Sequence, residues 1–286
     1  MRRVGLAQHA IAFATGSAIP DRISAARQIA TKYRPDIDGL RAVAIAAVFV
    51  FHAKHDFLPG GFIGVDVFFV ISGFLIIRII LDDLETNTFS LTAFYARRSR
   101  RIFPALICVL AAIWAVGWHL MLPEDFQELG KQIFAGAAFS SYLLTYSQVG
   151  YFDAPAITKP FLHLWSLGVE EQFYLVTPLA LIAAARWRLS VPWTLGVGAA
   201  ASIASNVVLV RYDQAAAFYL PFTRFWELLV GGGLAYAVVH FPRHLLRLQH
   251  WTVSLLGMLL IGSPAPARKA DIAQPLGHWP QASANT

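Results

Sequence analysis

The sequence predicts an all-α membrane protein, a polytopic transmembrane helical bundle with about seven spanning helices plus one re-entrant or partial segment. Of its 286 residues, 57% are hydrophobic and only 14% are charged, whereas soluble domains carry about 25% charged residues. Several apolar runs approach the roughly 20 residues that a helix needs to cross a bilayer. The runs are continuously apolar rather than alternating, so helices and not barrel strands are the expected spanning elements.

The apolar runs follow one another along the chain without a repeat of fixed period. They cover residues 40–53, 62–81, 102–122, 131–147, 166–185, 191–210, 215–239 and 251–262. Basic residues before the first run and after the second place both segments on the cytoplasmic side, because cytoplasmic loops are rich in Lys and Arg. A full crossing by 131–147 would put the later basic groups on the wrong side. We therefore expect that run to be the re-entrant or partial segment.

The chain divides into three parts by composition. Residues 1–32 form a basic leader, 33–262 a membrane domain, and 263–286 a polar Pro/Ala-rich tail that we expect to be disordered. The leader faintly resembles a signal peptide, but Gln8 and His9 dilute its apolar core and favour a cytoplasmic tail. No fold logic predicts a stop after residue 262, so we expect the domain to be incomplete at its C-terminal end.

Several ionisable residues lie inside the apolar runs, where each costs about 2.5–3.5 kcal/mol on insertion scales and usually faces a cavity or a partner. Arg41 and His52 are eleven residues apart, which returns to nearly the same helical face about 16 Å further along. Arg224 and Glu227 share a face at a spacing of three residues. We expect residues of four helices to meet at one level: His52, Asp66, Glu170, Glu171, Arg224 and Glu227.

These residue types suit proton transfer. A histidine such as His52 can take a proton from an attacking hydroxyl, and Asp66, Glu170 or Glu171 could fix its tautomer. Arg224 could offset developing oxyanion charge. Each residue also has a structural interpretation: His52 as an interfacial histidine bonded to the backbone, Asp66 as the partner of a basic residue, and Arg224 in an ion pair, which we favour. No third ligand accompanies His52 and His55, so no metal is expected.

Arg97, Arg98, Arg100 and Arg101 follow the second run and suit a phosphate-rich ligand. The alternative is a topology signal in contact with anionic lipid. The formal net charge of +6 does not indicate nucleic acid, because the basic residues lie between apolar runs. The glycines at 231–233 lie within an apolar run and predict close helix packing rather than a phosphate loop.

Five motifs occur in order between residues 33 and 240. They are YRPDIDGLRA at 33–42, GGFIGVDVFFVISGF at 60–74, FYARRSRRIFP at 94–104, HLWSLGVEEQFY at 163–174 and PFTRFWEL at 221–228. Together they resemble the acyltransferase-3 family of integral-membrane O-acyltransferases. That family has an arginine and a histidine with ten residues between them, and these match Arg41 and His52. Its paired loop arginines match Arg98 and Arg101.

The resemblance implies a ten-helix domain in the bacterial inner membrane, with a cytoplasmic N-terminus. It implies transfer of an acyl group, acetyl foremost, from cytoplasmic acyl-CoA to a hydroxyl of a cell-envelope glycan at the outer face. Acyl-CoA is then a co-substrate rather than a bound cofactor, and Arg41, Arg97, Arg98 and Arg101 are its expected binding residues. The partners implied are the lipid bilayer, acyl-CoA and the glycan. A transporter of an acylated or anionic molecule and an inactive fragment of the enzyme remain the alternatives.

Overall fold

The computed structural model describes residues 35–54, 57–86, 88–148 and 161–241, and all secondary structure in these ranges is helical. The helices are α3 (Pro35–Ala53), α4 (Ile63–Glu85), α5 (Leu91–Leu120), α6 (Pro123–Ala137), α7 (Ser141–Ser147), α8 (Leu164–Arg186), α9 (Val191–Tyr212), α10 (Gln214–Tyr219) and α11 (Pro221–His240). The leader 1–32, the run 251–262 and the tail 263–286 lie outside the described residues. The all-helical fold class is confirmed for the part of the chain that is described.

Local sequence accounts for several helix starts. Proline occupies the first turn of α6, α9 and α11, where its missing N–H would have no helical partner. The Ser90 side chain accepts a hydrogen bond from the backbone N–H of Ala93 and caps α5, and Asp213 caps α10 in the same way. The C-terminal ends of α6 and α8 reverse through Phe139 and Arg188, which have positive φ angles of 53° and 58°.

Four described helices are long and apolar enough to cross a membrane: α4, α5, α8 and α9. The prediction of about seven spans is not confirmed. The run 131–147 is not one helix, because it is divided between α6 and α7 at the left-handed residue Phe139. The run 215–239 is divided between α10 and α11, where Leu220 is extended and Pro221 begins the next helix.

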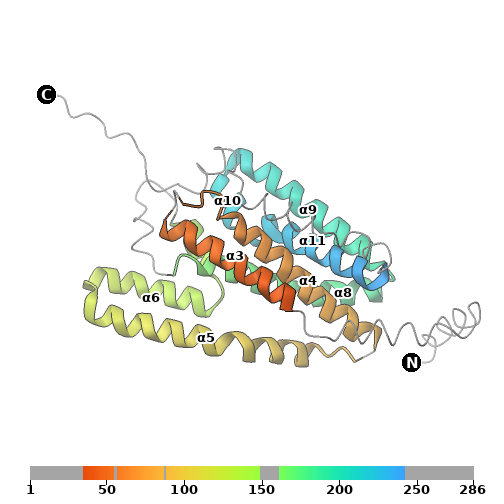
Figure 1. Cartoon of the computed structure of the whole chain (residues 1–286), viewed down its shortest axis with the longest axis horizontal. Coiled ribbons are helices and arrows are strands. Elements are labelled where there is room, and N and C mark those ends of the chain that lie inside the picture. The colour runs from red at the N-terminus through yellow and green to blue at the C-terminus, as the bar shows by residue number, and fades with distance from the viewer. Residues whose placement is uncertain (1–34, 55–56, 87, 149–160, 242–286) are drawn as a thin grey trace, which may run out of the picture. The chain divides into compact units, whose positions relative to one another are not determined.

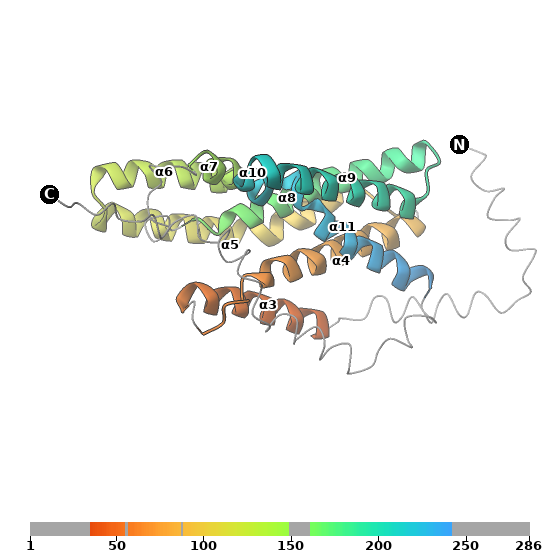
Figure 2. The ribbon, with the colours of Figure 1, turned by 90° about the horizontal axis from the view of Figure 1, so that it is seen from above.

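The chain forms two compact units, residues 1–40 and 41–286. In the second unit, α11 packs against both α4 and α9, and α5 forms a hairpin with α6 (Figures 1 and 2). The hairpin buries Leu106, Leu110 and Leu129 together with Phe161. By contrast, most apolar side chains of α5 and α9 are exposed, as contact with lipid tails requires.

Glycines allow α4 and α11 to approach closely. A methyl group on Gly73 would overlap the carbonyl oxygen of Leu228, and one on Gly231 would overlap that of Val70. A methyl group on Gly232 would meet the side chain of Ile77. The predicted packing role is therefore confirmed for Gly231 and Gly232, in the manner of small-residue contacts between membrane helices. This contact sets the distance between Asp66 of α4 and the pair Arg224 and Glu227 of α11.

Candidate functional site

A partly buried ion network joins α4 to α11. Nη2 of Arg224 donates to Oδ1 of Asp66 at 2.6 Å, and Nη1 lies 3.2 Å from Oε1 of Glu227. The Glu227 side chain is only 1% exposed and that of Arg224 13%. We call Asp66, Arg224 and Glu227 the Arg224 cluster. Two carboxylates neutralise the guanidinium, so the structural interpretation of this arginine is favoured over oxyanion stabilisation.

Aromatic rings surround the Arg224 guanidinium. Its central carbon lies 5.7 Å from the ring centroid of Phe69, 5.8 Å from that of Trp165 and 5.5 Å from that of Phe218. Within about 6 Å, a ring face attracts a cation. Phe69 and Trp165 are themselves buried. The Arg224 cluster is therefore held by residues of α4, α8, α10 and α11 at once.

A second ion network joins α5 to α8. Nη2 of Arg98 lies 3.4 Å from Oε1 of Glu170, and its Nε lies 3.6 Å from Oε1 of Glu171. The guanidinium carbon lies 3.5 Å from the ring centroid of Tyr174, whose hydroxyl donates to Glu170. We call these four residues the Arg98 cluster. A partly buried arginine bonded in this way stabilises the contact between two helices, because removing it would leave two carboxylates uncompensated.

The Arg98 cluster corrects one expectation from the sequence. The sequence predicts Glu170 and Glu171 at the level of His52, away from the arginines of 97–101, yet Arg98 contacts both carboxylates. The reason is the packing register: Tyr95, one turn earlier in α5, donates to the carbonyl oxygen of Leu175 in α8. This register brings the eighth residue of α5 level with the seventh and eighth residues of α8.

The other basic residues of this region have different surroundings. Arg97 is exposed and pairs with Asp83 at 3.0 Å, and Arg100 donates to the carbonyl oxygen of its own helix at Ala96. Arg101 is exposed. The Arg41 guanidinium lies over the ring of Phe68, 4.9 Å from its centroid. Of the predicted donor-binding residues, Arg98 is thus the one whose charge is taken up by buried carboxylates.

The third feature is a pair of histidines. Nδ1 of His52 lies 2.8 Å from the carbonyl oxygen of Val48, which can only accept a hydrogen bond. Nδ1 is therefore the protonated nitrogen and Nε2 carries the lone pair. The ring centroids of His52 and His163 are 4.4 Å apart at 78°, an edge-to-face contact. Much of the His163 surface is exposed. Neighbouring atoms still remove part of its ring from solvent, and this desolvation, followed by the charge of His52, lowers its pKa below the ordinary 6.5.

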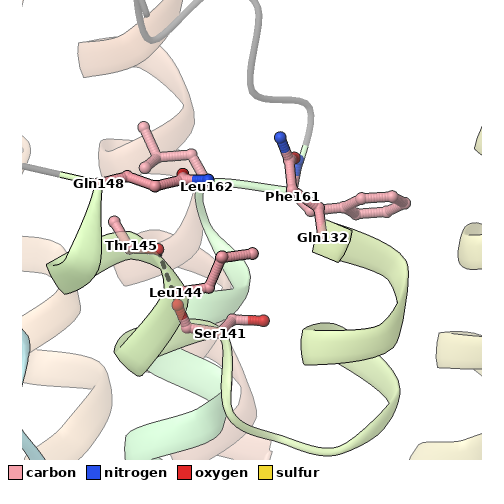
Figure 3. Close-up of a pocket in the computed structure, with 7 residues that line it drawn as sticks. All are labelled: Gln132, Ser141, Leu144, Thr145, Gln148, Phe161 and Leu162. Atoms are coloured by element: carbon pink, nitrogen blue, oxygen red, sulfur yellow. Dashed lines mark hydrogen bonds between the residues drawn. The ribbon is translucent and has the colours of Figure 1, made fainter. Parts of the chain in front are cut away.

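A small polar hollow lies beside this region, between α6, α7 and the segment that leads into α8 (Figure 3). Gln132, Ser141, Thr145 and Gln148 line it together with apolar side chains. The hollow has room for about one water molecule. The hollow is therefore too small to serve as the site of a large donor such as acyl-CoA.

The architecture, with its ion networks between apolar helices and a pair of histidines, agrees with the sequence comparisons. The family model for an acyltransferase domain matches residues 34–283. The chain belongs to this acyltransferase family. The match begins one residue after the predicted start of the membrane domain and continues beyond residue 262. No solved structure gives a significant match.

Two relatives of this acyltransferase extend the comparison. Peptidoglycan O-acetyltransferase OatA of Listeria monocytogenes serovar 1/2a is 37% identical over 214 residues, which are 72% of this chain and 34% of OatA. An uncharacterized protein of Haemophilus influenzae is 41% identical over 179 residues, which are 59% of this chain and 73% of that protein. The chain thus spans about a third of the length of OatA.

The acyltransferase brings together some of the predicted residues and separates others. Asp66 joins the Arg224 cluster, and Glu170 and Glu171 join the Arg98 cluster. In the described ranges, the contacts of the His52 ring are with Val48, Phe51 and His163 and not with any of these three acids.

The structure adds His163, which sequence reasoning treats as an interfacial histidine and not as a site residue. The signal for it was present, because His163 opens the motif HLWSLGVEEQFY at 163–174. A histidine that precedes an apolar run, rather than lying within it, has the pattern of an interfacial residue. Its neighbour across the helix packing, His52, lies more than a hundred residues earlier in the chain.

Proposed function

We propose that the chain transfers an acyl group, acetyl foremost, from acyl-CoA to a hydroxyl of a cell-envelope glycan, with a peptidoglycan sugar as the first candidate. Membership of the acyltransferase family and the similarity to OatA support this choice. The observation that carries it is the His52 side chain. Its Nδ1 donates to the Val48 carbonyl, so Nε2 carries the lone pair and can accept a proton from a hydroxyl.

The chemistry follows from that tautomer. The acceptor hydroxyl oxygen attacks the thioester carbonyl carbon while its proton passes to Nε2 of His52. A new C–O ester bond forms and the C–S bond breaks. The proton on Nε2 then passes to the departing thiolate, which leaves as free CoA. His52 returns to its starting tautomer, with Nδ1 still bonded to the Val48 carbonyl.

The arginines of α3 and α5 are the proposed binding residues for acyl-CoA. Arg97 and Arg101 are exposed on α5, so their charges can reach the phosphates of acyl-CoA. Arg41 is half-buried beside Phe68 and belongs to the same donor site. In this proposal Arg98 acts through Glu170 and Glu171, by fixing α5 against α8 so that its neighbours face the donor.

The proposed location is the bacterial inner membrane, with the N-terminus and the arginines of α5 on the cytoplasmic side. Charge distribution supports this orientation, because Lys and Arg concentrate in cytoplasmic loops. The orientation can be tested with single cysteines placed at Ser99 and at Lys131 in a protein that lacks Cys108. A membrane-impermeant maleimide added on the periplasmic side should label the cysteine at 131 and not the cysteine at 99. Equal labelling at both sites would contradict the orientation.

Release of free CoA tests the activity. The purified full chain, in detergent, receives acetyl-CoA with and without peptidoglycan fragments, and His52→Ala is compared with the exposed histidine control His119→Ala. We expect acceptor-dependent release by the wild type and by His119→Ala, and loss of about 10²–10⁴-fold in His52→Ala, the usual contribution of a general base.

Two other outcomes would contradict the proposal. Equal release from wild type and His52→Ala would show that this histidine is not the base. Movement of a labelled anionic solute into vesicles holding the protein, without any release of free CoA, would favour a transporter.

A further inference from the structure

Among the described residues, His52 has no carboxylate to hold its ring. A base that accepts a proton needs a group that fixes its orientation, as the third member of a catalytic triad does. The hydrogen bond to Val48 fixes one nitrogen, but it follows the i−4 pattern that a histidine near a helix end can form with its own backbone. The remaining contact from another helix segment is His163.

We propose that His163 is the positioning residue of His52, holding the imidazole edge-to-face so that Nε2 stays directed at the acceptor hydroxyl. The inference rests on the proposed function for its catalytic meaning. The near-perpendicular contact, 4.4 Å between centroids and 78° between ring planes, supports the His52 ring on one side. With the Val48 carbonyl at one nitrogen and His163 at the ring, both the tautomer and the plane of His52 are defined.

His163 is itself firmly placed. Its carbonyl oxygen accepts a hydrogen bond of 3.1 Å from the Ser166 hydroxyl in the first turn of α8. Two residues later, the buried Trp165 packs edge-on against Phe69 of α4 and against Tyr219 of α10. Trp165 also borders the guanidinium of Arg224. The Arg224 cluster and Trp165 therefore hold the start of α8, the helix that directly follows His163.

The electrostatics of the pair agree with this role. Burial and then the charge of His52 lower the pKa of His163, which favours its neutral form. When His52 takes the acceptor's proton, its ring becomes a cation. A neutral ring beside it adds no like charge, whereas a protonated neighbour would repel it.

The test compares His163→Ala and His163→Phe with the exposed control His119→Ala. Release of free CoA gives kcat and KM, and ¹⁵N chemical shifts of histidine-labelled protein give the tautomer of His52. We expect His163→Ala to lower kcat by about 10–100-fold, the cost of a misplaced group, with KM for acetyl-CoA unchanged. The His52 tautomer should become mixed. His163→Phe keeps an edge-to-face ring and should restore most of kcat and the single tautomer.

The outcomes separate this inference from the proposed function. Wild-type kcat in His163→Ala, with activity lost in His52→Ala, would overturn the positioning role alone. Equal losses in His163→Phe and His163→Ala would exclude the ring contact as the cause. An unchanged His52 tautomer in His163→Ala would overturn the role whatever the turnover, because that measurement needs no substrate.

Discussion

The close packing of α4 against α11 can be tested by one methyl group. Gly231→Ala would place a Cβ against the carbonyl oxygen of Val70 and the backbone nitrogen of Phe74. Neither atom can move by a side-chain rotation, so the two helices must separate. Two residues along the same helix, a Cβ on Gly233 meets nothing within 4 Å. Gly233→Ala is therefore a matched control.

The two variants share one energy term and differ in another. Replacing glycine by alanine inside a helix stabilises it by about 0.5–1 kcal/mol in both variants. Overpacking costs about 1–3 kcal/mol and applies only to Gly231→Ala. The difference between the variants is thus the overlap alone. We expect Gly231→Ala to be less stable than Gly233→Ala by about 1–3 kcal/mol, which is roughly 2–4 °C in Tm for each kcal/mol in proteins of 150–250 residues.

Thermal unfolding in detergent, followed by loss of the monodisperse peak on size exclusion, measures this difference. Gly233→Ala should match or exceed the wild-type Tm, and Gly231→Ala should fall below it. Equal Tm values for the two variants would refute the reasoning, since they would mean that α4 does not approach α11 at this glycine. A Tm for Gly233→Ala below that of Gly231→Ala would also refute the reasoning, because it would reverse the predicted order of the two variants.

Two further changes test the polar contacts. Asp66→Asn should lower the free energy of unfolding by about 1–3 kcal/mol, because it weakens a charged hydrogen bond to Arg224. The control Lys131→Gln, at an exposed ion pair, should change it by about 0–1 kcal/mol. Equal effects of the two changes in the same unfolding assay would contradict the structure. Hydrogen bonds from the Ala216 N–H and then the Tyr146 hydroxyl lower the pKa of Asp213 below its ordinary 3.8. Its stabilisation is therefore present above about pH 4 and lost as the pH falls through the lowered pKa. The Tm advantage of wild type over Asp213→Asn should shrink at low pH, and an advantage that grows there would contradict the assignment.

Much of the molecule follows from the sequence. Unbroken apolar runs can satisfy their backbone in a membrane only as helices, so the helical fold class was predictable. Proline and capping residues set many boundaries, as at Ser90 and Pro221. The pairing of Arg224 with Glu227 was also predictable, because residues three apart on a helix are neighbours whatever the tertiary structure.

Contacts between helices were decided by the tertiary structure. Asp66 is bonded to Arg224 and Arg98 to Glu170, although 158 and 72 residues separate them in the chain. The residue spacing within one helix fixes a face, but not which helix meets that face or at what height. Those depend on how the ridges of one helix fit the grooves of another, and here also on the glycines that admit a backbone.

The same distinction explains the histidine pair and the broken run at 131–147. The sequence determined that His52 ends one helix and that apolar residues fill 131–147. Only packing decided that His163 lies against His52, and that the chain turns at Phe139, whose carbonyl fits against Gly168 of α8. A local pattern records the propensity of each segment, whereas rotation and register arise from many side chains of several helices packing together at once.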